Sequence, residues 1–222
     1  VRKGSSEGSG TAGTVGQALT GNYGDLTLNA DGSYTYVANH ADADALDAGD
    51  FVTDYFNYTV SDGTATDTAL ISIKVVGVND APSAQNDVGV IVEDGTLTVT
   101  NGANATLTGD SYDATGENSG DLIDTSSSSH TDSDLDTSAS LSITQIKKDG
   151  GSNSAVAVGS SYNSSGTQVT GTYGTLTIGA DGSYTYAATA DAADPLDVGE
   201  SDTDVFVYTL SDGTATTTAT LT

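Results

Sequence analysis

One long sequence motif occurs twice in this chain, and it restricts the possible folds more than any other feature. The segment Gly21–Tyr36 recurs 150 residues later as Gly171–Tyr186, and the register then continues without a gap. The triplet Ser61-Asp62-Gly63, for example, recurs as Ser211-Asp212-Gly213. A repeat of this kind indicates two copies of one folding unit.

The two copies differ in extent, because the region from about residue 83 has almost no counterpart before the first copy. An incomplete β-sandwich exposes an unpaired sheet edge. We therefore expect either that the chain samples a longer array or that another chain completes the first module. The expected domains are the C-terminal part of a first sandwich at 1–78, a short linker at 79–82, and a nearly complete second sandwich at 83–222 with a long acidic loop at 110–137.

Alternating apolar residues and Asp-Gly turns predict strands rather than helices. In each copy the first predicted hairpin turns at Asp31-Gly32 or Asp181-Gly182, and the second turns at Asp62-Gly63 or Asp212-Gly213. Further strands are predicted at 88–92 and 96–100, on either side of a turn, and at 141–146. Only 42–48 and 191–196 have a composition that suits a single helical turn.

Short strands at this spacing predict an all-β fold of tandem antiparallel β-sandwich modules, similar to immunoglobulin domains. Pro82 favours extended geometry at the residue before it and ends any strand. The linker at 79–82 is therefore expected to be short and stiff, with neighbouring modules placed end to end.

The charge of the chain excludes several classes of partner. Five basic and 31 acidic residues give a formal net charge of −26, and only four of the acids are Glu. A surface this negative repels phosphate backbones, so we expect no nucleic-acid partner. No apolar stretch is long enough for a membrane-spanning helix, and the absence of Cys excludes thiolate metal sites and cysteine nucleophiles.

The acidic residues themselves point to a hard cation. Asp132, Asp134 and Asp136 alternate along the chain, so their side chains can meet on one side of an extended loop. Ca²⁺ takes six to eight oxygen ligands in flexible geometry, whereas Mg²⁺ requires a tighter octahedron. The motif lacks the fixed Gly and distal Glu of an EF-hand. The alternative interpretation is a solvated acidic loop without any metal.

Further oxygen donors are expected near the same module boundary. We predict a calcium cluster between the modules, to which the linker, the long loop, the last hairpin turn and the first module all contribute. The predicted ligands are Asn79, Asp80, Asp87, Asp132, Asp134, Asp136, Asp212, Asp47, Asp50 and Asp54. For Asp212 a simple turn role competes strongly, because Asp-Gly at a hairpin needs no metal.

No catalytic pattern accompanies these carboxylates. His40 and His130 both lie in polar stretches, and no nucleophile elbow, zinc-binding HExxH motif or phosphate-binding glycine loop occurs. Paired carboxylates are too frequent here to indicate glycosidase chemistry. We therefore do not expect an enzyme.

The repeated segments resemble a known family. The similarity is to the VCBS repeat. It lies in Gly171–Tyr186, in the following Leu196–Gly199 and Asp204–Gly213, and in the linker Gly77–Pro82 that leads to Glu93-Asp94-Gly95. Such repeats occur in very large bacterial surface and secreted adhesins, often of the RTX type, and are similar to bacterial cadherin-like sandwiches. The long loop and the incomplete first module depart from the usual pattern.

The resemblance implies a calcium-stiffened extracellular stalk or adhesion segment on a bacterial surface or in a secreted protein, with neighbouring repeats of the same chain as its partners. It also implies that Asn79, Asp80, Asp132, Asp134 and Asp136 are calcium ligands. Two alternatives stay open. One is a module that binds carbohydrate or another surface ligand through 110–137 and Tyr112. The other is a self-assembling fibre subunit in which another copy completes the first sandwich by strand addition.

Overall fold

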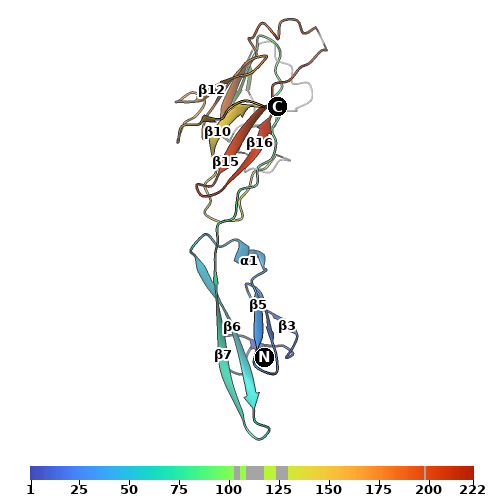
Figure 1. The fold of residues 1–222 in the computed structure, drawn as a ribbon, viewed down its shortest axis with the longest axis vertical. Coiled ribbons are helices and arrows are strands. Elements are labelled where there is room, and N and C mark those ends of the chain that lie inside the picture. Colours follow the sequence, from blue (N-terminus) through green and yellow to red (C-terminus); the bar gives the residue numbers. More distant parts are fainter. Residues whose placement is uncertain (103–105, 109–117, 124–129, 198) are drawn as a thin grey trace. The chain divides into compact units, whose positions relative to one another are not determined.

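A computed structural model describes residues 1–102, 106–108, 118–123, 130–197 and 199–222. The chain divides into two compact units (Figure 1). Unit 1 contains residues 1–80 and 135–139, and unit 2 contains residues 81–134 and 140–222. The last three residues of the predicted acidic loop, 135–137, thus belong to unit 1, together with 138 and 139 of the predicted second module.

Unit 1 consists of two antiparallel sheets and one helical turn. One sheet has the strand order β2-β1-β6-β7, and the other has the order β3-β4-β5. The elements are β1 (Arg2–Lys3), β2 (Thr11–Ala12), β3 (Ala18–Thr20), β4 (Asp25–Leu28), β5 (Tyr34–Val37), α1 (Ala41–Asp44), β6 (Phe51–Ser61) and β7 (Thr66–Val76).

Unit 2 repeats this arrangement with more strands. Its sheets have the orders β11-β10-β15-β16 and β12-β13-β14-β8-β9. The elements are β8 (Thr96–Val99), β9 (Thr106–Thr108), β10 (Ser142–Lys148), β11 (Ser154–Ala155), β12 (Thr167–Thr170), β13 (Thr175–Ile178), β14 (Tyr184–Ala187), β15 (Phe206–Ser211) and β16 (Thr216–Leu221).

These sheets confirm the predicted all-β fold of tandem antiparallel sandwiches. The two Asp-Gly hairpins of each copy form where the alternation predicts them, as β4–β5 and β6–β7 in unit 1 and as β13–β14 and β15–β16 in unit 2. Gly32 and Gly182 take φ angles of +88° and +85°. Residues that carry a side chain rarely adopt backbone angles in this left-handed region, which is why these turns use glycine.

Two local expectations need correction. Residues 88–92 do not form a strand; the chain there makes an isolated parallel bridge from Asp87 to Leu221, and β8 pairs with β14 and β9 instead. The helix-tolerant stretch at 42–48 contains the single turn α1, whereas 191–196 forms only hydrogen-bonded turns. Pro195 lies inside that second stretch and removes a backbone donor.

The cores of the two units differ in size. Unit 2 buries a large cluster that includes Tyr184, Phe206 and Tyr208, all at most 2% exposed. The cluster in unit 1 is built around Leu19, Leu26 and Phe56. In both units a tyrosine meets a phenylalanine edge-to-face: the ring centroids are 6.2 Å apart for Tyr36–Phe56 and 6.0 Å apart for the equivalent pair in unit 2. Such a pair contributes about 0.5–1.5 kcal/mol beyond its buried area.

The predicted acidic loop is partly a core element. Its described residues 118–123 pack on unit 2, where Leu122 is fully buried and Ile123 packs against the core. The Leu122 N–H donates to the Gly182 carbonyl at 3.1 Å. The few apolar residues of this acidic stretch thus contribute to the core of unit 2. Tyr112, proposed for carbohydrate binding, lies outside the described residues, because the structure describes neither 109–117 nor 124–129.

Candidate functional site

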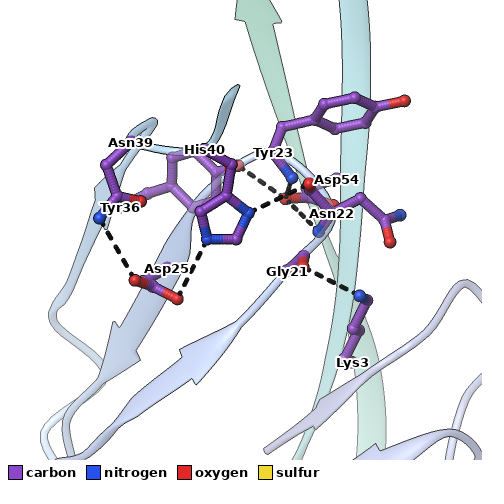
Figure 2. A network of polar contacts seen from close by, with 9 residues as sticks. All are labelled: Lys3, Gly21, Asn22, Tyr23, Asp25, Tyr36, Asn39, His40 and Asp54. Carbon is purple, nitrogen blue, oxygen red and sulfur yellow. Dashed lines mark hydrogen bonds and ion pairs between the residues drawn. The ribbon is translucent and has the colours of Figure 1, made fainter. Parts of the chain in front are cut away.

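The most developed polar network in unit 1 surrounds the carboxylate of Asp54 (Figure 2). Asp54 lies on β6 and is fully buried. Its oxygens accept hydrogen bonds from the Asn22 N–H at 2.8 Å, the Tyr23 N–H at 3.0 Å and the Tyr36 hydroxyl at 2.6 Å. A Cβ at Gly21 would lie 2.2 Å from the Asp54 carboxylate, so only glycine allows the loop to approach. Asp54, a predicted calcium ligand, thus holds the loop before β4 against β6.

The same network recurs around Asp204 in unit 2. This buried carboxylate accepts hydrogen bonds from the Thr172 N–H at 2.6 Å, the Tyr173 N–H at 2.9 Å and the Tyr186 hydroxyl at 2.7 Å. The Lys148 Nζ atom lies 3.5 Å from Oδ1 of Asp204. Burial opposes ionisation of Asp204, but the hydrogen bonds from Thr172, Tyr186 and Tyr173 outweigh this effect and lower its pKa.

The repetition identifies the role of these two groups. Both carboxylates face backbone N–H groups and a tyrosine hydroxyl within one unit, which is the arrangement of a structural acceptor. Burial, followed by the hydrogen bond to the carboxylate, raises the pKa of Tyr36 and of Tyr186. The tyrosine partners were not predicted from the sequence. The repeat nevertheless contains a signal for them, because three features occur in both copies at the same spacing: the Gly-x-Tyr-Gly segment, the second tyrosine of Tyr-Thr-Tyr, and the later Asp.

Beside the Asp54 network lies a smaller set of surface contacts (Figure 2). His40 Nε2 is 3.6 Å from the Asp25 carboxylate, and His40 Nδ1 is 3.1 Å from the Asn22 carbonyl. A side-chain hydrogen bond from Thr20, with smaller contributions from Asn39 and His40, lowers the pKa of Asp25. These groups bridge the start of β4 to the segment before α1.

A third buried carboxylate, Asp87, connects the entry segment of unit 2 to its core. Asp87 is 2% exposed. The Tyr208 hydroxyl lies 2.7 Å from one Asp87 oxygen, and the Ser119 hydroxyl donates to the other at 3.0 Å. Burial raises the pKa of Asp87 to about 6, although the hydrogen bonds from Tyr208 and Ser119 oppose the shift. Asp87 was predicted as a calcium ligand, but here both oxygens take part in this network.

Several predicted ligands meet at one end of unit 1, which we call the acidic end and define by Asp47, Asp50, Asn79, Asp80 and Asp136. The Asp80 N–H donates to the Asp136 carboxylate at 3.0 Å, and the Gly77 N–H donates to the Asp50 carbonyl at 2.9 Å. Asn79 donates through its side-chain amide to the Asp80 carbonyl.

The segment 135–139 is held at this end by hydrogen bonds to carboxylates. The Asp47 carboxylate accepts from the Ser138 N–H at 3.1 Å and from the Ser138 hydroxyl. The hydrogen bonds from Ser138, the hydroxyl first, lower the pKa of Asp47. Asp136 is only 8% exposed. Hydrogen bonds at Asp47, Asp80 and Asp136 therefore attach the segment 135–139 to the rest of unit 1.

The remaining predicted ligands belong to unit 2. Asp132 is buried, and its carboxylate accepts from the Gln85 N–H at 2.8 Å, next to the backbone pair Ser83–Ser133. Asp134 is half-buried. Asp212 accepts from the Thr214 and Ala215 N–H groups at 2.6 and 2.7 Å, which is the turn role that competed with metal binding. In the part of the chain that the structure describes, no group of three or more His, Asp or Glu side chains is arranged to hold a metal ion.

Within the described residues no helix is both long and apolar enough to cross a membrane. In a comparison with known protein families, residues 5–74 match the family described as bacterial Ig domain. No curated protein matches the chain. Bacterial Ig domains are in general non-catalytic and typically extracellular or surface-exposed, and the match indicates a structural or adhesion-type module. It supports the bacterial Ig-like or cadherin-like character that the resemblance implied, whereas the narrower VCBS identification stays a prediction.

Proposed function

We propose that this chain is a segment of a calcium-stiffened extracellular stalk of a large bacterial surface or secreted adhesin, built from VCBS-type repeats. The observation that carries the proposal is the repeated Ig-like sandwich: the same two hairpins and the same buried Asp–Tyr network occur in both units. The match of residues 5–74 to a bacterial Ig domain supports it. Tandem modules of this kind serve as spacers because each sandwich folds around its own core.

The residue types at the acidic end are hard oxygen donors of the kind that Ca²⁺ prefers. Their carboxylates are not grouped as a metal site in the described residues, so calcium binding must draw them together. In the bound state Asp47, Asp80 and Asp136 would supply carboxylates, and Asn79 would supply an amide oxygen. Backbone carbonyls nearby can complete such a coordination shell. Once bound, the ion would neutralise part of the charge and tie 135–139 to the rest of unit 1. The predicted participation of Asp132 and Asp134 stays a prediction.

Asp50 offers its backbone carbonyl to Gly77 at this end and remains a candidate. For Asp54, Asp87 and Asp212 the hydrogen bonds already described favour structural roles, so we leave them out of the proposed ligand set. This distinction is testable because the two groups of aspartates give opposite expectations for calcium affinity.

The proposal is tested by calcium titration of the full chain in chelator-treated buffer at fixed ionic strength. We expect Ca²⁺, but not an equal concentration of Mg²⁺, to raise the melting temperature. Binding to the folded state alone contributes about 2.7 kcal/mol at a hundredfold excess over the dissociation constant. The double variant Asp47→Asn/Asp136→Asn should weaken calcium binding measured by calorimetry, whereas the exposed Asp67→Asn should not.

Two results would reject the calcium part of the proposal. One is an equal melting temperature with calcium and with chelator, together with no heat of binding. The other is an unchanged calcium affinity in the Asp47→Asn/Asp136→Asn variant. Small-angle scattering with and without calcium then tests stiffening separately, because a stalk that calcium stiffens must change its distribution of interatomic distances.

A further inference from the structure

The repeat allows each residue of unit 1 to be compared with its counterpart in unit 2. Lys3 lies opposite Phe56 in the β1–β6 pair, as Lys148 lies opposite Phe206 in the β10–β15 pair. Val1 therefore occupies the position of Ile146. From Gly21 onward the counterpart lies 150 residues later. Residues 81–145 have no counterpart in the first copy of the repeat.

In unit 2, part of the region 81–145 forms strand β8, which pairs with β14. Strand β14 lies between β13 and β8, with Tyr184 opposite Val99 and Tyr186 opposite Leu97. Its counterpart β5 pairs with β4 on one side, and among the described residues no strand pairs with its other side. A free edge presents a row of unpaired N–H and C=O groups that can accept another strand.

Side chains near this edge show the same difference. Tyr34 is 53% exposed, whereas Tyr184, its counterpart in an identical Asp-Gly-Ser-Tyr-Thr-Tyr hairpin, is fully buried. Val60 is 53% exposed, whereas its counterpart Leu210 is fully buried. Unit 1 therefore keeps apolar side chains at positions that unit 2 uses for its core.

In unit 2, residues from 81–145 cover the positions that are exposed in unit 1. Ile143 on β10 lies opposite Leu210, and it is only 1% exposed. The Tyr208 hydroxyl, whose counterpart is Tyr58, contacts the Gln85 carbonyl and the Asp87 carboxylate. Leu97 and Val99 on β8 are at most 2% exposed. All of these covering residues come from 81–145.

The second edge of unit 1 has the same character. In unit 2 the Asp87 N–H donates to the Thr220 carbonyl at 2.7 Å, and the Thr222 N–H donates to the Asp87 carbonyl at 3.0 Å. The position of Thr220 corresponds to Leu70 on β7, and among the described residues no strand pairs with that side of β7. In Figure 1 the β6–β7 hairpin projects beyond the other strands of unit 1, where β5 and β3 do not accompany it.

We propose that unit 1 carries a strand-acceptor site, formed by the free edge of β5 and by the exposed side chains of Tyr34 and Val60. Its occupant is a polypeptide segment with the sequence pattern of residues 81–145, in which a strand such as Thr96-Leu97-Thr98-Val99 pairs with β5. Main-chain hydrogen bonds would supply part of the affinity, and alternate apolar side chains would supply the fit. The site does not depend on calcium, so it is tested in the presence of a chelator.

The test adds the occupant to the full chain by fusing a copy of residues 81–145 directly before Val1, which stands where Ile146 follows Gln145 in unit 2. The chain has no Cys, so a single Val60→Cys substitution reports on the site through its rate of reaction with a thiol reagent. Val158→Cys, at a fully exposed position, gives the rate of an open site, and Leu210→Cys gives the rate of a covered one.

We expect Val60→Cys to react at a rate near that of Val158→Cys in the unfused chain and at least about tenfold more slowly in the fusion, because covered sites react only after local opening. A matched fusion carrying Leu97→Asp and Val99→Asp in the added segment alone should restore the fast rate. A slow Leu210→Cys shows that unit 2 stays folded in each protein.

Two results would overturn the proposal. If the fusion leaves the Val60→Cys rate unchanged while Leu210→Cys stays slow, a segment of this pattern does not occupy the site. If Val60→Cys is already protected in the unfused chain, and more so at higher protein concentration, a second copy covers this face instead.

Discussion

At the scale of single residues, the buried carboxylates carry most of the structural information. Asp54 and Asp204 occupy equivalent positions and accept the same kinds of donors, which are two backbone N–H groups and one tyrosine hydroxyl. Hydrogen bonds to an ionised acceptor are stronger than those to a neutral one. Each carboxylate therefore fixes a loop to the strand that carries it.

Replacing Asp54 by Asn should destabilise unit 1 by about 2 kcal/mol, because the amide N–H₂ faces donors and leaves one of them unsatisfied. This corresponds to roughly 30-fold faster hydrogen exchange of the β6 amides, measured by mass spectrometry. The matched control Asp67→Asn changes an exposed acid on the neighbouring strand β7 and should leave exchange nearly unaltered. Equal exchange in both variants would contradict a structural role for the Asp54 charge.

Asp87 should make the stability of unit 2 depend on pH. Its pKa of about 6 in the folded state lies above the ordinary value of 3.8, so between these two values the folded state holds more protons than the unfolded state. The contribution of Asp87 to stability is therefore complete below about pH 4 and is lost as the pH rises through 6. The shift corresponds to about 3 kcal/mol.

Asp87→Asn cannot ionise, so it should remove this part of the pH dependence. We expect the variant to gain up to about 3 kcal/mol relative to the parent chain between pH 4 and pH 7. Denaturant unfolding of both proteins at several pH values measures the difference. A difference that stays constant across this range would show that Asp87 does not titrate where its burial requires.

At the scale of elements, the segment 118–123 behaves as part of the sandwich. Leu122 is fully buried, and the Ser119 and Asn118 side chains accept hydrogen bonds from the Val88 and Val90 N–H groups at 3.0 and 2.7 Å. This segment therefore fastens the irregular chain after Asp87, where the predicted strand does not form.

Leu122→Ala should destabilise unit 2 by about 3 kcal/mol, because it removes buried apolar surface and leaves a cavity. Leu135→Ala is the matched control, since Leu135 belongs to the same acidic loop but is 60% exposed. It should change stability by less than about 0.5 kcal/mol. Thermal unfolding followed by circular dichroism measures both, and similar losses would mean that burial of Leu122 is not what stabilises the segment.

At the scale of the whole molecule, the net charge of −26 opposes compact structure through self-repulsion. Added salt shortens the screening length from about 30 Å at 0.01 M to about 10 Å at 0.1 M. We therefore expect the melting temperature in chelator-treated buffer to rise with NaCl. Each kcal/mol gained corresponds to roughly 2–4 °C for a chain of this size.

Differential scanning calorimetry from 0.01 to 0.5 M NaCl measures this effect. A melting temperature that is independent of salt would show that the acidic side chains are too dispersed to repel one another strongly. The salt series also gives the baseline for the calcium experiment, because a specific calcium site must stabilise the chain beyond the screening that salt alone provides.

The sequence by itself determined the hairpins, the all-β class and the repeat. Leu26–Tyr36 and its copy contain their own alternation and their own Asp-Gly turn, so their structure depends on residues that are adjacent in the chain. The roles of Asp54 and Leu122 could not be predicted in this way. Asp54 acts through Asn22, Tyr23 and Tyr36, and Leu122 through the turn at Gly182, and these contacts depend on long-range packing.

Only the tertiary structure decided which of two identical sequences is core and which is surface. Tyr34 and Tyr184 lie in the same local sequence and the same hairpin, yet one is half exposed and the other has no contact with water. The reason is that burial belongs to the sheet and not to the strand: β8 pairs with β14, whereas no described strand pairs with the equivalent edge of β5. Local sequence sets the backbone, and the presence of a neighbouring strand sets what the side chains can do.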